Sequence, residues 1–384
     1  MKITDKLYVM YHGRKVGTMA LYQGRVAAFE YDREWLADGF SISPFSLPLE
    51  KKVFIPKADP FDGIFGVFAD SLPDGWGRLL VDRLMLKNHI DPYETGNMDR
   101  LAIVGRSGMG ALCYEPEYHF QTEQKQVTLD EIAQECRRVL YTEESEKLDE
   151  LFRLGGSSGG ARPKILTKID GRDWIIKFPS SGDSDKIGRQ EYEYSVCARE
   201  CGIEMARTRL FPSESCAGYF GTERFDRRQR NDGETERIHM ISAAALLETS
   251  HRIPNLDYEI LMKLTMELTK DFGEIEKLYR LMCFNVFAHN RDDHSKNFAY
   301  LYDEREGRWR LSPAYDLTYS YSIGGEHATT VRNPGTGEIL AVADQISMDR
   351  RRAKRIAEEI RECVEMRLGP YIMREREMRK QDSI

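Results

Sequence analysis

The chain has 384 residues, 41% of them hydrophobic, and a formal net charge of −7. This length and apolar content are enough for two or three folded modules. The acidic balance argues against a large nucleic-acid-binding surface of its own. No apolar run approaches the ~18 residues that a membrane span needs, and no signal-peptide core follows Met1, so we expect a cytoplasmic protein that does not bind membranes.

In the first 118 residues, strand-like runs alternate with turns and are followed by a helical segment at 74–90. This pattern predicts a small α+β subdomain. The glycine-rich segment 105–111 is interpreted as a turn, in which glycines serve the backbone conformation, rather than as a second nucleotide site. The whole chain is predicted to be an α+β protein in four parts, with an N-terminal subdomain at 1–118, a helical connection at 119–150, a small lobe at 151–225 and an all-helical lobe at 226–384.

Seven cysteines are scattered along the chain without a C-x-x-C motif. Cys197 and Cys201 are one helical turn apart, a spacing that suits neither a zinc finger nor a disulfide framework. The prediction is that the thiols are reduced and mostly buried.

A glycine-rich segment at 154–164, LGGSSGGARPK, precedes two strand-like runs, Ile165–Ile169 and Asp173–Phe178. The intervening Asp170–Gly171 pair predicts a tight hairpin turn. Glycines let backbone amides approach phosphate oxygens without side-chain clashes, although such a loop can also be a simple connector. The spacing is not that of a Walker A sequence. The candidate phosphate-binding residues of this loop are Ser157, Ser158, Gly159 and Gly160.

The second strand-like run carries Lys177 after three apolar residues. Burial of an unpaired ammonium group is costly, so a lysine at this place indicates a partner. In a kinase it would hold the α- and β-phosphates of ATP and pair with a helix glutamate, for which Glu191 in the first turn of a predicted helix at 188–202 is the candidate. The alternative is a lysine on an edge strand whose ammonium group reaches water.

Residues 219–227 read YFGTERFDR. A strand that ends in Glu223, Arg224 and Phe225 suits the hinge of a kinase, where backbone groups contact adenine. A hinge carries no distinctive residue types, so this assignment depends on the neighbouring motifs.

The segment 289–316 contains the strongest chemical pattern, and a helix predicted at 273–288 leads into it. Asp292 precedes Asn297 by five residues, and Asp316 follows two strand-like runs joined by a polar turn. Protein-kinase-like enzymes use this order, with one aspartate that orients the attacking hydroxyl, an asparagine that binds a metal ion and a second aspartate that binds Mg²⁺. We expect a hairpin, Phe298–Tyr302 with Arg308–Leu311, that brings the three oxygen ligands together. The alternative is a set of solvated loop carboxylates.

Six short segments occur in the order seen in the HipA family of bacterial serine/threonine kinases, which act as toxins of toxin–antitoxin pairs. These segments are SSGGARPK, WIIKFP, QEYEY, ERFDR, NRDDHSKNF and LSPAYD. The segment at 65–83, FGVFADSLPDGWGRLLVDR, also resembles the N-terminal subdomain of that family. The resemblance covers nearly the whole chain. It implies a two-lobed, protein-kinase-like (HipA-like) fold that uses ATP and Mg²⁺.

The resemblance implies a role for individual residues. These roles are catalysis for Asp292, His294 and Asn297, metal binding for Asn297 and Asp316, and nucleotide binding for the glycine-rich loop, Lys177, Glu223, Phe225 and His294. It further implies autophosphorylation of Ser157, with the adjacent Ser158 as the alternative site. One departure is Pro163, which removes a backbone N–H from the loop.

The resemblance also implies partners. Known substrates in the family are aminoacyl-tRNA synthetases, and the partner is a small helix-turn-helix antitoxin (HipB-like), through which DNA would mainly be contacted. Two other functions stay open. One is a small-molecule or lipid kinase, because related folds share the Asp–Asn–Asp site. The other is a co-repressor with a vestigial kinase site, against which the presence of Asp292, Asn297, Asp316 and Lys177 argues.

Overall fold

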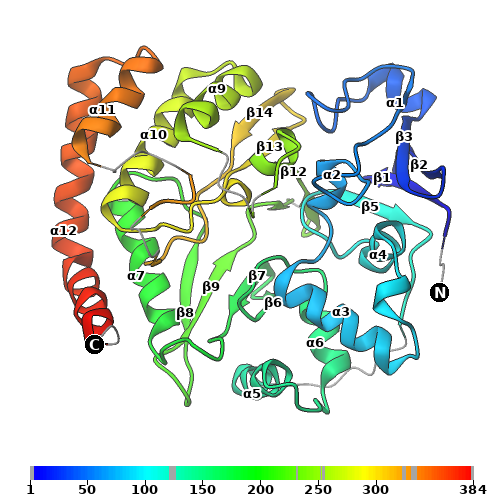
Figure 1. Ribbon diagram of the computed structural model, residues 1–384, viewed down its shortest axis with the longest axis horizontal. Coiled ribbons are helices and arrows are strands. Elements are labelled where there is room, and N and C mark those ends of the chain that lie inside the picture. The colour runs from blue at the N-terminus through cyan, green and yellow to red at the C-terminus, as the bar shows by residue number, and fades with distance from the viewer. Residues whose placement is uncertain are drawn as a thin grey trace. The chain divides into compact units, whose positions relative to one another are not determined.

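The chain forms two compact units in a computed structural model (Figure 1) that describes residues 4–120, 127–230, 232–250, 252, 256–321, 326–329 and 335–381. The first unit comprises Met1–Asp185 and Phe211–Ser250, and the second comprises Lys186–Leu210 and His251–Ile384. This division is coarser than the four predicted parts, whose boundaries stay a prediction. Within the described residues, no helix is both long enough and apolar enough to cross a membrane.

The N-terminal sheet of the first unit is antiparallel and has the strand order β4-β3-β2-β1-β5. Its strands are β1 (Lys6–Tyr11), β2 (Arg14–Tyr22), β3 (Val26–Tyr31), β4 (Val53–Phe54) and β5 (Leu112–Glu115). In β1, Leu7, Val9 and Tyr11 are buried whereas Lys6 and Tyr8 are exposed. This alternation is that of a strand with one face on a core, and it explains why the sequence pattern predicted strands correctly here.

A second antiparallel sheet of the first unit pairs β6 (Lys164–Ile169) with β7 (Arg172–Lys177), and β7 with β9 (Tyr219–Glu223). The strand β8 (Thr208–Phe211) spans the boundary between the units. Asp170 and Gly171 both have positive φ, 52° and 76°, as a two-residue type I′ hairpin turn requires. The predicted Asp-Gly hairpin is therefore confirmed. The remaining strands of this unit are β10 (Arg227–Gln229), β11 (Thr235–Arg237) and β12 (His239–Ser242).

Among the helices of the first unit, α5 (Leu129–Leu140) begins at a well-defined N-cap. Thr128 and Glu131 form a capping box before α5, in which Ile132, Cys136 and Val139 are buried at helical spacing. The full set is α1 (Arg33–Asp38), α2 (Gly66–Ala69), α3 (Gly75–Lys87), η1 (Pro92–Glu94), α4 (Asn97–Val104), α5 (Leu129–Leu140), α6 (Leu148–Gly155) and α8 (Ala243–Leu246). The helices predicted at 74–90 and 128–141 are confirmed.

One hydrophobic core of the first unit joins parts that lie far apart in the sequence. Trp76 and Leu80 of α3 pack in the same cluster as Ile165 of β6 and Trp174 of β7, together with buried residues of α5 and α6. Each such large buried side chain contributes roughly 1.5–3 kcal/mol relative to an exposed one. The second sheet is therefore supported by helices that precede it in the chain.

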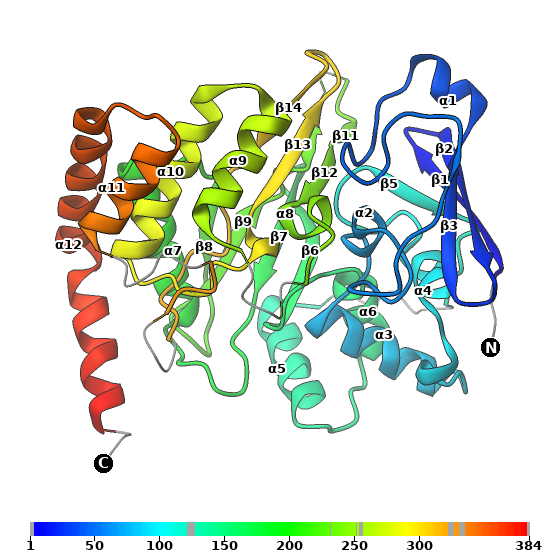
Figure 2. The same cartoon turned by 45° about the horizontal axis from the view of Figure 1, so that its top comes forward.

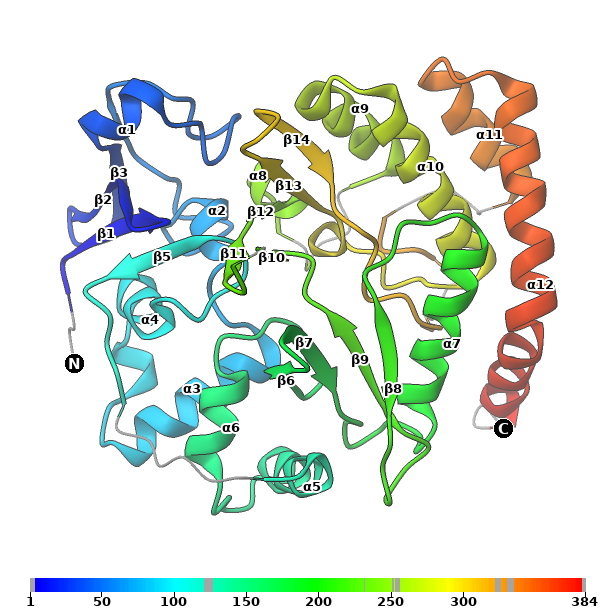
Figure 3. The same ribbon diagram turned by 180° about the vertical axis from the view of Figure 1, so that it is seen from behind.

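The second unit is mainly helical. Its elements are α7 (Ile187–Glu200), α9 (Tyr258–Thr269), α10 (Phe272–Phe287), η2 (Ser295–Asn297), β13 (Ala299–Asp303), β14 (Arg308–Leu311), α11 (Thr336–Gln345) and α12 (Arg350–Gln381). The long helix α12 lies beside α7, α10 and α11 (Figure 3), and α9 contacts both α10 and β14 (Figure 2). The prediction of an all-helical lobe at 226–384 is wrong in one respect, because the strands β10 to β14 lie within that range. Two of them, β13 and β14, form because hydrophobic alternation and a polar turn at 298–311 favour a hairpin over a helix.

A buried histidine makes the stability of the first unit sensitive to pH. His239 is fully buried, and its Nε2 lies 2.8 Å from the carbonyl oxygen of Ile42. Burial lowers the pKa of His239 to about 4. The unfolded chain takes up this proton near pH 6.5, so stability present above that pH is lost as the pH falls toward 4.

We expect His239 to account for a loss of roughly 2–3 kcal/mol in the free energy of unfolding between pH 6.5 and pH 4. Urea unfolding of the wild type and of His239→Gln at a series of pH values measures this contribution as a difference. The variant should be less pH-dependent in that window. Identical pH profiles for the two proteins would contradict the prediction.

Candidate active site

The segment that carries the predicted catalytic aspartate begins where α10 ends. His289 has a φ of 53° and turns the chain away from the helix axis. The backbone N–H of Asn290 donates to the carbonyl oxygen of Asn285, and its side-chain Nδ2 donates to Oδ1 of Asn285, both at 2.9 Å. The start of the loop is thus bound to the last turn of α10, and the predicted helix and the loop that follows it are confirmed.

Asp293 is the buried anchor of this loop. Its side chain is 0% exposed, and Oδ2 accepts a hydrogen bond from the Tyr258 hydroxyl at 2.7 Å and lies 3.0 Å from Nδ1 of His327. The backbone N–H of Thr329 donates to Oδ1 at 3.1 Å, and the Thr329 hydroxyl donates to the Asp293 carbonyl oxygen. Burial, with the charge of Asp293, raises the pKa of Tyr258 well above its usual range.

Asp292, next to this anchor, points outward with a side chain that is 68% exposed. Ser320 Oγ accepts the backbone N–H groups of Arg291 and Asp292 at 2.7 and 2.8 Å. Asn297 Nδ2 donates to the carbonyl oxygen of Asp292 at 2.6 Å, and His294 Nε2 lies 4.0 Å from Asp292 Oδ1. The structure therefore brings Asp292, His294 and Asn297 together on a loop whose backbone is fixed.

The hairpin β13–β14 returns the chain to this loop. Its strands form the predicted antiparallel hairpin, in which Tyr300 lies opposite Leu311. Asp316 follows with a φ of 55°. The residue before it, Tyr315, donates its hydroxyl to the Lys296 carbonyl oxygen at 2.6 Å, and Ser320, after it, binds the amides described above. Asp316 is thus flanked on both sides by residues that contact the loop of Asp292.

The donor set of these two loops suits a hard cation. Mg²⁺ prefers carboxylate and amide oxygens, which Asp316 and Asn297 supply. Because Asn297 Nδ2 donates to the Asp292 carbonyl oxygen, the amide is oriented with Oδ1 as its remaining acceptor. The residues therefore fit the metal that the kinase pattern implies.

The glycine-rich loop lies in the first unit, between α6 and β6. Ser157 is half-buried and donates its hydroxyl to the Ser107 carbonyl oxygen at 2.9 Å. Ser158 is only 2% exposed and donates to the Gly155 carbonyl oxygen at 2.6 Å. Gly160 has a φ of 82°, a conformation that favours glycine. The two serines thus differ in accessibility, which the sequence did not reveal.

The first turn of α3 holds the backbone of this loop. The Gly160 N–H donates to the Asp74 carboxylate, and the Trp76 N–H donates to the Gly160 carbonyl oxygen at 2.9 Å. A Cβ atom added at Gly77 would lie 2.1 Å from the Ser158 carbonyl oxygen, so only glycine fits there. One amide of the loop already binds an anionic oxygen, which is the chemistry that a phosphate needs. Asp74 and Gly77 were not predicted as site residues; the DGWG sequence is their only local signal.

Lys177 ends β7, which pairs with β6 on one side and β9 on the other. It is 8% exposed, and its Nζ lies 5.6 Å from the centroid of the Phe220 ring. The alternative of an edge-strand lysine is therefore wrong. Lys164, which was not predicted as a site residue, is also buried and lies opposite Lys177 in the ladder, and its Nζ donates to the Gly159 carbonyl oxygen at 2.5 Å. One buried cation thus contacts the glycine-rich loop, and a second lies opposite it in the ladder.

The remaining predicted residues lie on other elements. Glu191 is buried in the second turn of α7 rather than the first, because the helix begins at Ile187; its pairing with Lys177 stays a prediction. Glu223 ends β9, and its Oε1 accepts a hydrogen bond from Arg172 Nη1 at 2.8 Å. Phe225 follows and is half-buried. Their contact with adenine stays a prediction.

The second glycine-rich segment, 105–111, is occupied by protein groups. Its Gly110 N–H donates to Asp226 Oδ2 at 2.7 Å, and Arg237 Nη2 donates to the carbonyl oxygens of Gly108 and Gly110 at 3.0 and 2.8 Å. Burial raises the pKa of Asp226, but the guanidinium groups of Arg224 and Arg227 outweigh it and lower the pKa below its usual range. The interpretation of this segment as a structural turn is confirmed.

The glycine-rich loop before a lysine strand, and the two acidic loops around a hairpin, are features of a kinase-like fold. Two family models match the chain, the HipA N-terminal domain over residues 7–115 and the HipA-like C-terminal domain over residues 156–368. The chain belongs to the HipA family.

Individual relatives agree with this assignment. The chain is 27% identical over 343 residues to Y4mE of Sinorhizobium fredii strain NGR234, a protein whose name marks it as a candidate kinase, with 81% of this chain and 76% of that one covered. It is 24% identical over 207 residues to Y4dM of the same strain, covering 50% and 48%. Among solved structures, HipA of Shewanella oneidensis MR-1, in complex with HipB and operator DNA, matches with a TM-score of 0.70 at 16% identity, covering 96% of this chain and 91% of that one. This last likeness establishes the fold.

Proposed function

We propose that the chain is an ATP-dependent serine/threonine protein kinase that acts as the toxin of a toxin–antitoxin pair. The observation that carries the proposal is the contrast between two adjacent aspartates. Asp293 is buried and holds the loop, whereas Asp292 is exposed beside His294 and Asn297. A carboxylate presented to solvent on a fixed backbone is what general-base chemistry on an incoming hydroxyl requires.

In the proposed reaction, Asp292 orients the substrate hydroxyl and accepts its proton. Asn297 and Asp316 would hold Mg²⁺, which when bound neutralises charge on the transferred phosphoryl group. Lys177, Lys164 and the amides of the glycine-rich loop bind the phosphates of ATP. Their positive charges and N–H groups lie on backbone that is fixed by β-sheet pairing and by α3, so little reorganisation is needed when the nucleotide binds.

The remaining assignments belong to the same proposal. Glu223 and Phe225 contact adenine, and His294, 4.0 Å from the Asp292 carboxylate, contacts the nucleotide or the reacting hydroxyl. The protein acts in the cytoplasm and phosphorylates a translation-related protein such as an aminoacyl-tRNA synthetase.

A small helix-turn-helix antitoxin of the HipB type is the proposed partner, and DNA is contacted mainly through it. Membership in the HipA family and the net charge of −7 support this division of labour. Expression of the chain alone should slow growth, and co-expression of the helix-turn-helix protein encoded beside it should restore growth. Harmless expression of an active kinase would overturn the toxin assignment and leave the kinase assignment standing.

The kinase assignment is tested by incubating the purified chain with Mg²⁺ and ATP labelled at the γ-phosphate. We expect phosphate on Ser157, because Ser157 is half-buried at the loop surface whereas Ser158 is buried and bonded to the Gly155 carbonyl oxygen. A phosphate adds about −1.5 to −2 charges at pH 7. In a loop that holds ATP phosphates, this charge repels the nucleotide, so activity should decline as the modification accumulates.

Peptide mass spectrometry over residues 154–164 measures the modification. Ser157→Ala should prevent it and keep the enzyme active for longer, whereas Ser158→Ala, the matched control, should still be modified. Phosphate on Ser158 instead would overturn the site assignment. An enzyme that phosphorylates a protein substrate without modifying this loop would overturn self-inactivation.

A further inference from the structure

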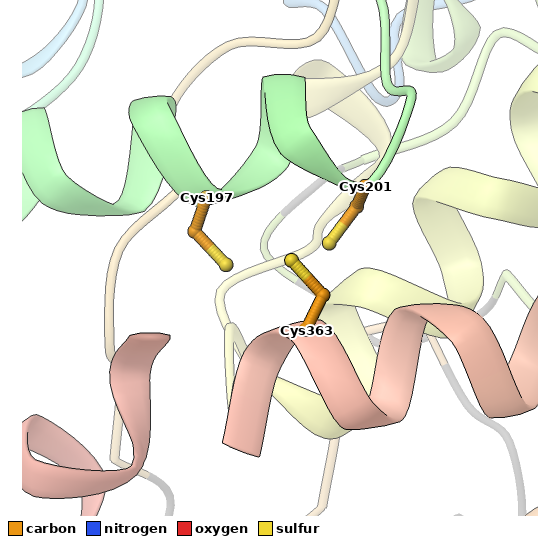
Figure 4. A group of neighbouring side chains, drawn as sticks. All are labelled: Cys197, Cys201 and Cys363. Carbon is orange, nitrogen blue, oxygen red and sulfur yellow. The ribbon is translucent and has the colours of Figure 1, made fainter. Parts of the chain in front are cut away.

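Three cysteines from two helices of the second unit meet at one point. Cys197 lies on α7, Cys201 is the capping residue that directly follows α7, and Cys363 lies on α12. Their Sγ atoms are all within 4.8 Å of one another (Figure 4). Cys197 and Cys201 are buried and Cys363 is half-buried. Four of the seven cysteines of the chain are buried, as predicted, and their reduced state stays a prediction. The clustering of three was not predicted.

The arrangement has a simple geometric origin. Residues four apart on a helix share one face, which places the thiols of Cys197 and Cys201 side by side toward α12. Cys363 points back at them from the facing helix (Figure 4). A bidentate ion pair between Arg367 and Glu200, with Nε to Oε2 at 2.6 Å, joins the same two helices. Glu200 directly precedes Cys201, and Arg367 follows Cys363 by one helical turn. The helices are thus held together at the level of the three sulfur atoms.

The spacing of the sulfur atoms is close to that of a metal-bound set. With metal–sulfur bonds of about 2.3 Å, thiolates around one ion lie roughly 3.8–4.0 Å apart. The separations of at most 4.8 Å need only a small side-chain adjustment to reach this range. No His, Asp or Glu of the described residues completes the cluster as a fourth ligand.

We propose that Cys197, Cys201 and Cys363 bind one thiophilic metal ion through three sulfur ligands. Zn²⁺ and Cu⁺ are the ions that soft thiolate ligands select among common cellular metals. Zn²⁺ would take a water molecule as its fourth ligand, and Cu⁺ would be trigonal. The bound ion links α12 to α7, the helix that also carries Glu191, and it stabilises the second unit. This site is independent of the proposed kinase chemistry.

Metal titration of the full-length chain tests the proposal. After treatment with a chelator and a reductant, the protein is titrated with Zn²⁺, and separately with Cu⁺, against a competing chromogenic chelator. We expect one ion per chain and a higher melting temperature in the loaded protein. Each of Cys197→Ser, Cys201→Ser and Cys363→Ser should weaken binding by at least ~100-fold, since changes to mere outer-shell partners already cost up to that amount. Cys216→Ser, a half-buried cysteine of the first unit, is the matched control and should bind normally.

A second readout uses the wild type alone and so does not depend on the folding of a variant. Bound metal should protect Cys363 from alkylation, as mapped by peptide mass spectrometry. Saturation by Cu⁺ but not by Zn²⁺ supports the three-sulfur site and assigns it to copper. Failure of both ions to bind, unchanged affinity in Cys363→Ser, or a disulfide among the three cysteines in protein whose thiols were blocked at lysis would overturn the proposal.

Discussion

Replacing Asp292 by asparagine should lower kcat/KM for phosphoryl transfer at least ~100-fold, the scale for loss of one key electrostatic group, and should leave the melting temperature unchanged. The asparagine side chain has nearly the same shape but cannot accept the proton of the attacking hydroxyl. The carboxylate is 68% exposed, so its replacement removes little that the fold depends on. Steady-state phosphorylation of a protein substrate and thermal unfolding measure the two effects.

The adjacent residue provides the matched control. Asp293→Asn places an NH₂ group among donors from Tyr258, His327 and Thr329, or leaves one of them without its acceptor. Disruption of a buried, charged hydrogen-bond set costs about 3 kcal/mol, so this variant should lose stability first and activity as a consequence. Wild-type rates in a folded Asp292→Asn protein would overturn the kinase assignment. A loss of stability in Asp292→Asn but not in Asp293→Asn would contradict the proposal that Asp292 is catalytic and Asp293 structural.

Replacing Asp316 by asparagine is also expected to lower the rate at least ~100-fold, because the carboxylate is the charged metal ligand. Asparagine tolerates the left-handed backbone, here with φ at 55°, better than most residues do. The substitution therefore tests the charge and not the conformation. Rates measured across a Mg²⁺ series at fixed ATP should show a requirement for much higher Mg²⁺.

Asp303→Asn serves as the control for Asp316→Asn. Its carboxylate lies at the end of β13, where Oδ2 accepts from Arg310 Nη2 at 3.1 Å, and it should leave the Mg²⁺ dependence unchanged. An Asp316→Asn enzyme with the wild-type rate at low Mg²⁺ would contradict the assignment of this residue to the metal.

Local patterns predicted those elements whose formation depends on neighbouring residues. The hairpin β13–β14 was predicted to within about one residue at each end because hydrophobic alternation and a polar turn determine it locally. The Asp170–Gly171 turn was predicted because few other residue pairs take positive φ twice in succession. The helix α10 followed from its long apolar face.

The features that needed the structure depend on residues distant in sequence. Asp292 and Asp293 are chemically identical in the sequence. The partners that distinguish the buried Asp293 are Tyr258, His327 and Thr329, each more than 30 residues away. The burial of Lys164 depends on its place opposite Lys177. Asp74 contacts Gly160 across 86 positions of sequence, and no local pattern records such a contact.

The dependence of the glycine-rich loop on α3 limits how this protein can be divided or recombined. The two HipA family models end and begin at residues 115 and 156, but the core shared by Trp76, Leu80, Ile165 and Trp174 crosses that gap. A fragment that begins at residue 156 would expose this apolar face to water and would lack the partners of Gly160. The glycine-rich loop therefore cannot be moved into another protein without the part of α3 that binds it. An exchange of residues 157–160 between family members would have to carry residues 74–77 with it, because Asp74 and Trp76 bind the backbone of Gly160 and Gly77 leaves room for Ser158.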